Sequence, residues 1–269
     1  MGKIDGKHIT GIIGNHILQR SRDGKTIIKM KQIRVQQSQA TKKASTVFGN
    51  ASTLSSAMRA DFFALTDKKC PGNLVNRLNT ANQTILLHCF DKSNQTYAFG
   101  QDSFKNLEGF DLNTNSPLSS YLWVRPYLNL NGNTLTLTIP AFEILAQLKM
   151  PGNANGLEIL VALGQYALRK SLNGPRIYKS ITLEKSQRQV PEQQISFEVA
   201  EGCLCVVALG LQFYEVKNNY RTALNTINIK PAAIIDAVIT PGQFNIEDHP
   251  SYGLWKPMIK LKLPASAGQ

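Results

Sequence analysis

The sequence predicts an α+β fold with a basic N-terminal β-hairpin arm, an antiparallel helical hairpin and a C-terminal antiparallel β-sandwich of the immunoglobulin-like type. An Asp-Gly turn near the N-terminus lies between two apolar and basic runs. Apolar residues then recur every three or four positions, and short alternating segments separated by turn residues fill the chain from about residue 120. These patterns are typical of a hairpin, of helices and of a sandwich. The expected boundaries are 1–36, 37–118 and 119–245, with an extended tail over 246–269.

The hairpin is expected from 11–35, where residues 16–20 and 25–31 flank Asp23-Gly24. Asp and Gly both tolerate the positive φ angles that a tight hairpin turn requires. An isolated hairpin is marginally stable in water, so this arm should lie against its own body or a partner. The residues expected to bind that partner are the basic side chains Arg20, Arg22, Lys25, Lys29, Lys31 and Arg34, with Ile17 and Ile27 as apolar anchors.

A helix is expected over 37–66 and a second one from residue 74, joined by a loop that contains Pro71-Gly72. The apolar spacing predicts that Leu54, Met58 and Phe62 are buried, while Arg59 and Ser55 or Ser56 lie outside. Gly49 is a place where the first helix could kink. The stretch 84–90 fits a helix or a strand, because short apolar runs are ambiguous.

Seven strands are expected in the C-terminal half, where Pro, Gly and Asn mark the turns between them. The tail contains Trp255, Met258 and Ile259, which are expected to anchor it. The expected strands are 121–130, 134–139, 157–168, 176–183, 194–199, 203–216 and 232–240.

The positive charge is concentrated near the N-terminus. The net charge is +12, and residues 1–69 alone contain 13 Lys and Arg against 4 Asp and Glu. This asymmetry favours an acidic partner for that segment, which includes nucleic acid, an acidic protein surface or a neighbouring subunit; a solvated basic face remains the alternative. No aromatic residue precedes Phe48, so nucleic acid would be bound through its backbone rather than by base stacking.

Nothing in the sequence indicates catalysis. The dinucleotide, phosphate-loop, zinc-protease and nucleophile-elbow motifs are absent, and the four histidines are far apart. Glu247-Asp248-His249 has no nucleophile beside it and is interpreted as a surface loop. Cys203 and Cys205 would face the same side of a strand and are interpreted as reduced core residues, not as a metal pair. We therefore expect no enzyme, cofactor, metal or small-molecule substrate.

The chain has no apolar run of 18 residues, so no membrane span is expected. Its N-terminus, MGKIDGKHIT, is polar and charged, unlike a secretory signal. The default expectation is a cytoplasmic protein, with leaderless export or release left open.

Several short motifs resemble a family of uncharacterised bacterial proteins of about this size. They include Gly14-Asn15 before the basic hairpin, Phe48-Gly49-Asn50-Ala51-Ser52, Leu107-Glu108-Gly109-Phe110, Leu112-Asn113, Ser116-Pro117-Leu118, Leu137-Thr138-Ile139-Pro140-Ala141-Phe142 and Met150-Pro151-Gly152. The resemblance covers about residues 10–170. That family has no established activity, so the resemblance implies no functional residue.

These observations lead first to a non-enzymatic structural or assembly subunit, a homo-oligomer or larger assembly. Its basic hairpin and tail would dock on neighbouring subunits, for example by strand addition to a sheet edge. The alternative is a nucleic-acid-associated protein that uses the same basic segment on phosphates. A third class, a carbohydrate- or ligand-binding sandwich, rests on fold analogy alone.

Overall fold

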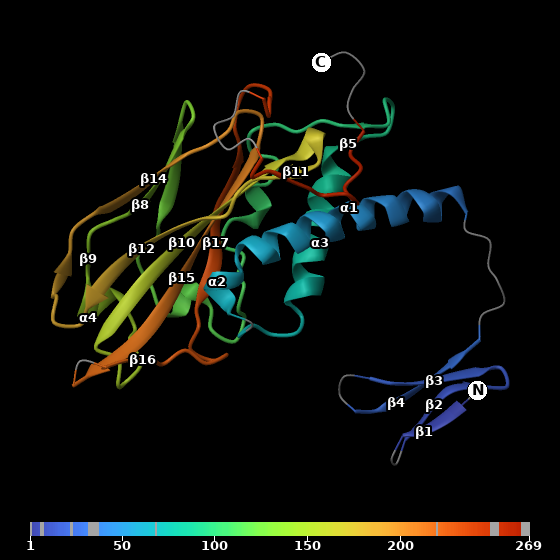
Figure 1. Ribbon diagram of the computed structural model, residues 1–269, viewed down its shortest axis with the longest axis horizontal. Coiled ribbons are helices and arrows are strands. Elements are labelled where there is room, and N and C mark those ends of the chain that lie inside the picture. The colour runs from blue at the N-terminus through green and yellow to red at the C-terminus, as the bar shows by residue number, and fades with distance from the viewer. Residues whose placement is uncertain are drawn as a thin grey trace. The chain divides into compact units, whose positions relative to one another are not determined.

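The computed structural model describes residues 2–5, 8–21, 24–31, 38–67, 69–218, 220–247 and 253–264. The chain divides into two compact units, residues 1–44 and 45–269 (Figure 1). Helices and antiparallel strands are both present, which confirms the predicted α+β class. Within the described residues, no helix is both long enough and apolar enough to cross a membrane.

The N-terminal unit contains a four-stranded antiparallel sheet in which each strand pairs with the next along the chain. The predicted hairpin is confirmed as its third and fourth strands. The two preceding strands were not expected. Gly14 adopts a φ of 57° in the turn between the second and third strands, a conformation that suits glycine. The strands are β1 (Gly2–Asp5), β2 (His8–Ile13), β3 (His16–Arg20) and β4 (Thr26–Met30).

The second unit is organised around a seven-stranded antiparallel sheet. Its two longest strands, β10 (Gly156–Ala167) and β15 (Leu204–Lys217), pair from Gly156 opposite Tyr214 to Tyr166 opposite Leu204. The other strands are β11 (Leu172–Asn173), β12 (Ile177–Glu184), β16 (Tyr220–Ala223), β17 (Ala232–Ile239) and β18 (Lys256–Pro257).

Smaller sheets surround this one. The three-stranded sheet has the order β14-β8-β7, and two strand pairs, β13–β9 and β5–β6, complete the set. Their bounds are β5 (Phe90–Asp91), β6 (Thr96–Tyr97), β7 (Tyr127–Asn131), β8 (Thr134–Ile139), β9 (Phe142–Glu143), β13 (Gln189–Val190) and β14 (Gln193–Glu198).

The two long helices follow the N-terminal sheet along the chain and precede the strands of the second unit. Helix α1 (Gln39–Asp61) is not interrupted at Gly49, and α3 (Leu74–Cys89) shows that the ambiguous stretch 84–90 is helical through Cys89. In Figure 1, α1 and α3 run in different directions and cross, so the predicted antiparallel pairing is not confirmed. The short helices are α2 (Phe63–Thr66), α4 (Ile144–Gln147), η1 (Lys105–Leu107), η2 (Leu118–Ser120) and η3 (Leu168–Lys170).

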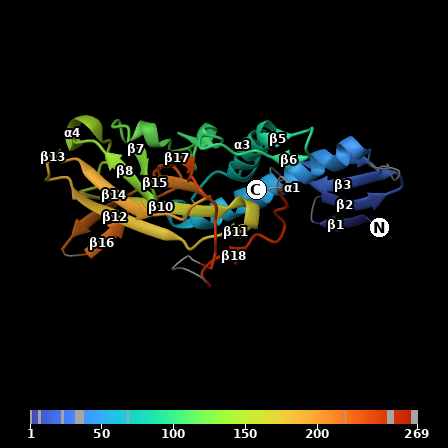
Figure 2. The same cartoon turned by 90° about the horizontal axis from the view of Figure 1, so that it is seen from above.

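Both faces of the large sheet are covered. On one face, Cys205, Val207 and Leu209 of β15 join the same apolar cluster as Leu135 and Leu137 of β8. On the other face, a second cluster joins residues of β15 to residues of α1 and α3, and Figure 2 shows the same elements from above. An immunoglobulin-like sandwich leaves the outer face of each sheet to solvent, so the helical layer explains why that prediction is not confirmed.

The predicted burial of Leu54 and Met58 on helix α1, and of Phe62 directly after it, is confirmed, whereas Arg59, expected outside, is half-buried. Of Ser55 and Ser56, one of which was expected to lie outside, Ser56 is the exposed one. Ser55 is buried, and its hydroxyl accepts a 2.8 Å hydrogen bond from Asn82 of α3. At the C-terminal end of α1, Asp61 is 2% exposed, and burial raises the pKa of its carboxyl group above the usual value.

Two expectations for the C-terminal half are wrong in detail. The strand expected over 121–130 begins only at Tyr127, directly after Pro126, whose ring removes a backbone donor. Trp255 and Met258 anchor the tail as expected, but Ile259 is 83% exposed because it lies in a turn whose apolar contacts come from Met258 and Leu261.

Truncation of Leu54 or Phe62 to Ala should lower the free energy of unfolding by about 2–5 kcal/mol, because each change leaves a cavity in the core between α1 and the sheet. Ser56→Ala, on the exposed side of the same helix, is the control and should change it by less than about 0.5 kcal/mol. Urea denaturation measures both. Equal effects at the two sites would mean that the helix is packed in another register.

Candidate functional site

The N-terminal sheet holds most of the residues that the sequence indicated as partner-binding. Ile17 and Arg20 lie on β3, Ile27 and Lys29 lie on β4, and Lys25 and Lys31 flank β4. Arg22 and Arg34 lie outside the described residues. The structure therefore brings six of the eight predicted residues together on one strand pair.

The pairing register assigns these residues to faces. Arg20 is opposite Thr26, and Ile17 is opposite Lys29. Side chains directly across an antiparallel pair point to the same face, and neighbours along a strand point to opposite faces. Arg20 therefore projects from one face and Lys29 from the other. A 3.1 Å hydrogen bond from Lys29 Nζ to Gln19 Oε1 fits this assignment.

One face carries cations at alternate positions of its edge strand. Lys25, Ile27, Lys29 and Lys31 are every second residue along β4 and its flanking positions, so their side chains point to the same face. This face also holds Ile12 and Ile17. We call it the lysine face. The cations that appeared as one group in the sequence are thus divided, because Arg20 points to the other side.

The opposite face carries no lysine between Gly11 and Lys31. Its apolar residues lie side by side on β2, β3 and β4, where Ile13, His16 and Met30 form one row and Gly11, Leu18 and Ile28 form the next. Ile28 is 65% exposed and Met30 is 73% exposed. We call this surface, made by Ile13, Leu18, Ile28 and Met30, the apolar face.

The N-terminal sheet has no core of its own. Among the side chains that the structure describes from residue 2 to residue 44, none is buried. Among the described side chains, the first buried apolar residue is Val47. A sheet of this size normally needs one face packed against other apolar groups to be stable, so the apolar face is a candidate contact surface.

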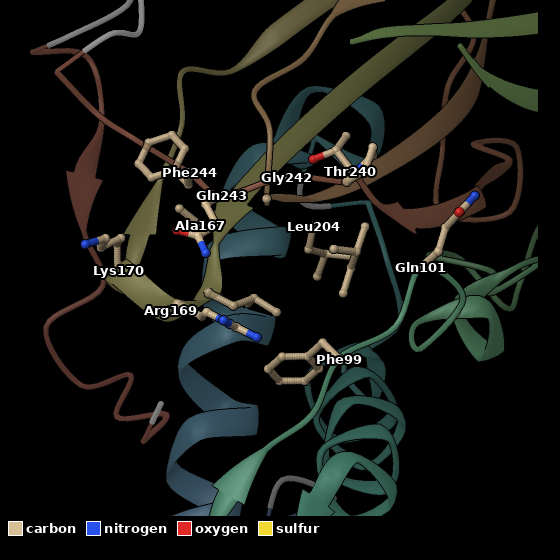
Figure 3. Close-up of a pocket in the computed structure, with 14 residues that line it drawn as sticks. Phe99, Gln101, Ala167, Arg169, Lys170, Leu204, Thr240, Gly242, Gln243 and Phe244 are labelled. Atoms are coloured by element: carbon tan, nitrogen blue, oxygen red, sulfur yellow. The ribbon is translucent and has the colours of Figure 1, made fainter. Parts of the chain in front are cut away.

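A cavity of about 670 Å³ lies at one end of the large sheet (Figure 3). It is formed where β10 and β17 end and β15 begins, and the segments around Phe99 and Gly242 close it. We call it the sheet-end cavity. Its lining residues are Phe99, Gln101, Ala167, Leu168, Arg169, Lys170, Gly202, Leu204, Ile239, Thr240, Pro241, Gly242, Gln243 and Phe244. Sequence reasoning did not find it, because these residues come from four separate segments.

The predicted cysteine pair is buried in the sheet. Cys203 and Cys205 are free thiols inside the apolar cluster of the first face. Burial raises the pKa of Cys203 to about 12 and raises that of Cys205 well above its ordinary value. No group of three or more potential metal ligands occurs among the described residues. Of the other predicted cluster, Glu247 is exposed, while Asp248 and His249 lie outside the described residues.

Comparison with known proteins gives no match for this chain among protein-family models, curated proteins or solved structures. The resemblance to a bacterial family therefore remains a prediction.

A thiol reagent should distinguish the four cysteines. At pH 8 the half-buried Cys70 and Cys89 should react in the folded protein, whereas Cys203 and Cys205 should react only after denaturation, because burial blocks access and disfavours the thiolate. Mass spectrometry of the modified peptides measures this. Rapid labelling of Cys203 under native conditions would contradict the burial of this strand.

Proposed function

We propose that this protein is a non-enzymatic assembly subunit whose N-terminal sheet docks on a neighbouring copy of the chain. The observation that carries the proposal is the four-stranded sheet without a buried side chain among its described residues. Removal of the apolar face from water would stabilise the sheet by roughly 25 cal/mol for each Å² buried. The neighbour would thus provide the cover that the sheet does not provide for itself.

The distribution of charge favours the apolar face as the contact between copies. Two lysine faces would bring Lys25, Lys29 and Lys31 against identical cations, and juxtaposed like charges oppose association. The apolar face is compatible with a copy of itself, because its central residues Leu18 and Ile28 are uncharged. Arg20 lies at the end of this face, opposite Thr26.

Charge also disfavours strand addition at one edge of the sheet. β4 is an edge strand, and lysines on an edge strand are a known means of preventing further strand pairing. Face-to-face packing therefore fits β4 better than the strand addition that was expected as an example from the sequence. The described part of the tail packs within its own unit through Trp255, Met258 and Leu261, so the proposal now rests on the sheet rather than on the tail.

The size of the sheet sets the expected affinity. Four strands spaced about 4.8 Å apart, each of about five residues at about 3.4 Å per residue, cover roughly 320 Å² per copy. Stable interfaces bury about 1,200–2,000 Å² in total. Packing of one pair of sheets should therefore be reversible, and the association should depend on protein concentration.

The alternative is binding of nucleic acid through the lysine face. The specific observation in its favour is that Lys29 on β4 and the flanking Lys25 and Lys31 fall on one face of the strand, an arrangement that can follow a phosphate backbone. The apolar face would have no role in this function, so substitutions on the two faces of β4 separate the two proposals.

The test uses the full chain and sedimentation velocity over a wide concentration range. Ile28→Asp combined with Met30→Asp should abolish association, because a carboxylate would be buried without a partner. Ile27→Asp, on the lysine face of the same strand, is the matched control and should leave association intact. Replacement of Lys25, Lys29 and Lys31 by Gln should preserve or strengthen association.

The nucleic-acid alternative predicts the reverse order. The triple Lys→Gln variant would then lose binding to random-sequence duplex DNA in fluorescence anisotropy, while Ile28→Asp would have little effect. Each lost phosphate contact should reduce the log–log salt slope by about 0.9. A wild-type chain that stays monomeric at every concentration would contradict the assembly proposal, whatever the DNA result.

A further inference from the structure

The sheet-end cavity is large enough to hold a small organic molecule. Its volume of about 670 Å³ falls within the range of about 300–1,000 Å³ that is usual for ligand pockets. All of its lining residues belong to the second unit, so it does not depend on the N-terminal sheet. Its function is therefore independent of the proposed assembly.

The apolar part of the lining is provided by the ends of the sheet strands and by two aromatic rings. Ala167 and Leu204 are buried at the ends of β10 and β15. Figure 3 shows Leu204 in the middle of the cavity, with Phe99 and Phe244 at its borders. This surface suits a flat or aliphatic group better than a strongly hydrated one.

The charged part of the lining is entirely positive. Arg169 and Lys170 are consecutive residues of η3, and the residues that line the cavity include no Asp or Glu. Within the described part of the chain, the side chains of Arg169 and Lys170 form no ion pair and no hydrogen bond. By contrast, Arg125, Arg176 and Arg221 each bind a carboxylate of the protein.

The position of Arg169 directs its charge toward the cavity. In Figure 3 its guanidinium group extends across the cavity in the direction of Phe99. A guanidinium group can donate two parallel hydrogen bonds to a carboxylate or phosphate, which makes it selective for planar or multidentate anions. The cation and the apolar surface are thus adjacent.

Hydrogen bonds hold the walls in place before any ligand binds. After η3, Ser171 Oγ donates to the Leu261 carbonyl at 2.8 Å, and the Met258 amide donates to the Ser171 carbonyl at 2.7 Å. On the opposite wall, the Thr240 hydroxyl donates to the Ala200 carbonyl at 2.7 Å. Such preorganisation lowers the entropic cost of binding.

Gly202 permits the close approach of the loop that forms this wall. A Cβ atom at this position would lie 2.5 Å from the backbone nitrogen of Phe244, and the φ of Gly202 is +63°. Any other residue would push Phe244 away from the cavity. The sequence therefore supports the shape of the cavity at a position where only glycine fits.

We propose that the sheet-end cavity binds a small organic anion. Arg169 meets its carboxylate, and its apolar body lies between Phe99 and Phe244. A neutral compound of the same shape retains the apolar contacts but loses the charge-assisted hydrogen bonds. Inorganic phosphate retains the charge but has no apolar body.

The test compares indole-3-acetate, its neutral amide and inorganic phosphate by calorimetric titration of the full chain. Indole-3-acetate should bind at least about tenfold more tightly than either of the others, because it alone combines both kinds of contact. Arg169→Gln with Lys170→Gln should reduce the affinity for indole-3-acetate about tenfold, to that of the amide, and leave amide binding unchanged.

Lys185→Gln with Arg188→Gln is the matched control. It removes the same two charges from residues that do not line the cavity, and it should leave all three affinities unchanged. An equal loss in this control would show attraction by net charge rather than a site, and would overturn the proposal. So would equal affinity for the acetate and the amide, or no binding of the acetate below about 5 mM.

Discussion

The structure depends on the requirement that an apolar sheet face be covered. In the large sheet this requirement is met twice. Along β15, Cys205, Val207 and Leu209 face the smaller sheet, while the intervening Val206 and Ala208 face the helices. Because alternate residues point to opposite faces, a strand with apolar residues at every position needs a layer on each side. This is why the helices pack on the sheet instead of forming a separate hairpin.

The buried polar groups of the second unit hold these layers together. Asp61, at the end of α1, accepts a 2.8 Å hydrogen bond from the Tyr166 hydroxyl of β10 and a 3.1 Å hydrogen bond from Arg176 Nε. These bonds oppose the effect of burial, which raises the pKa of the Asp61 carboxyl group. The Tyr178 hydroxyl donates to the Asp61 carbonyl as well. The N-terminal sheet has no comparable set of contacts among its described residues, and this contrast supports its proposed role as a docking element.

The sequence was informative where local pattern decides structure. The Asp23-Gly24 turn and the apolar spacing of Leu54, Met58 and Phe62 predicted the hairpin and the buried side of α1. Two further patterns in the sequence match the observed strands. Gly14-Asn15 between apolar runs indicates the turn that connects β2 and β3, and the uninterrupted apolar run from Cys203 to Leu209 indicates a strand covered on both faces. The sheet-end cavity had no such signal, because Phe99, Arg169, Leu204 and Phe244 meet only through tertiary packing.

In the proposed assembly, the N-terminal sheet is stabilised by a neighbouring copy of the chain. Hydrogen exchange of the backbone amides at high and at low protein concentration tests it most directly, because amide protection reports the free energy of local opening. Amides of β3 and β4 should be protected in the concentrated sample and exchange much faster on dilution, while those of β10 should remain protected in both. Protection of β3 and β4 that does not change with concentration would contradict it.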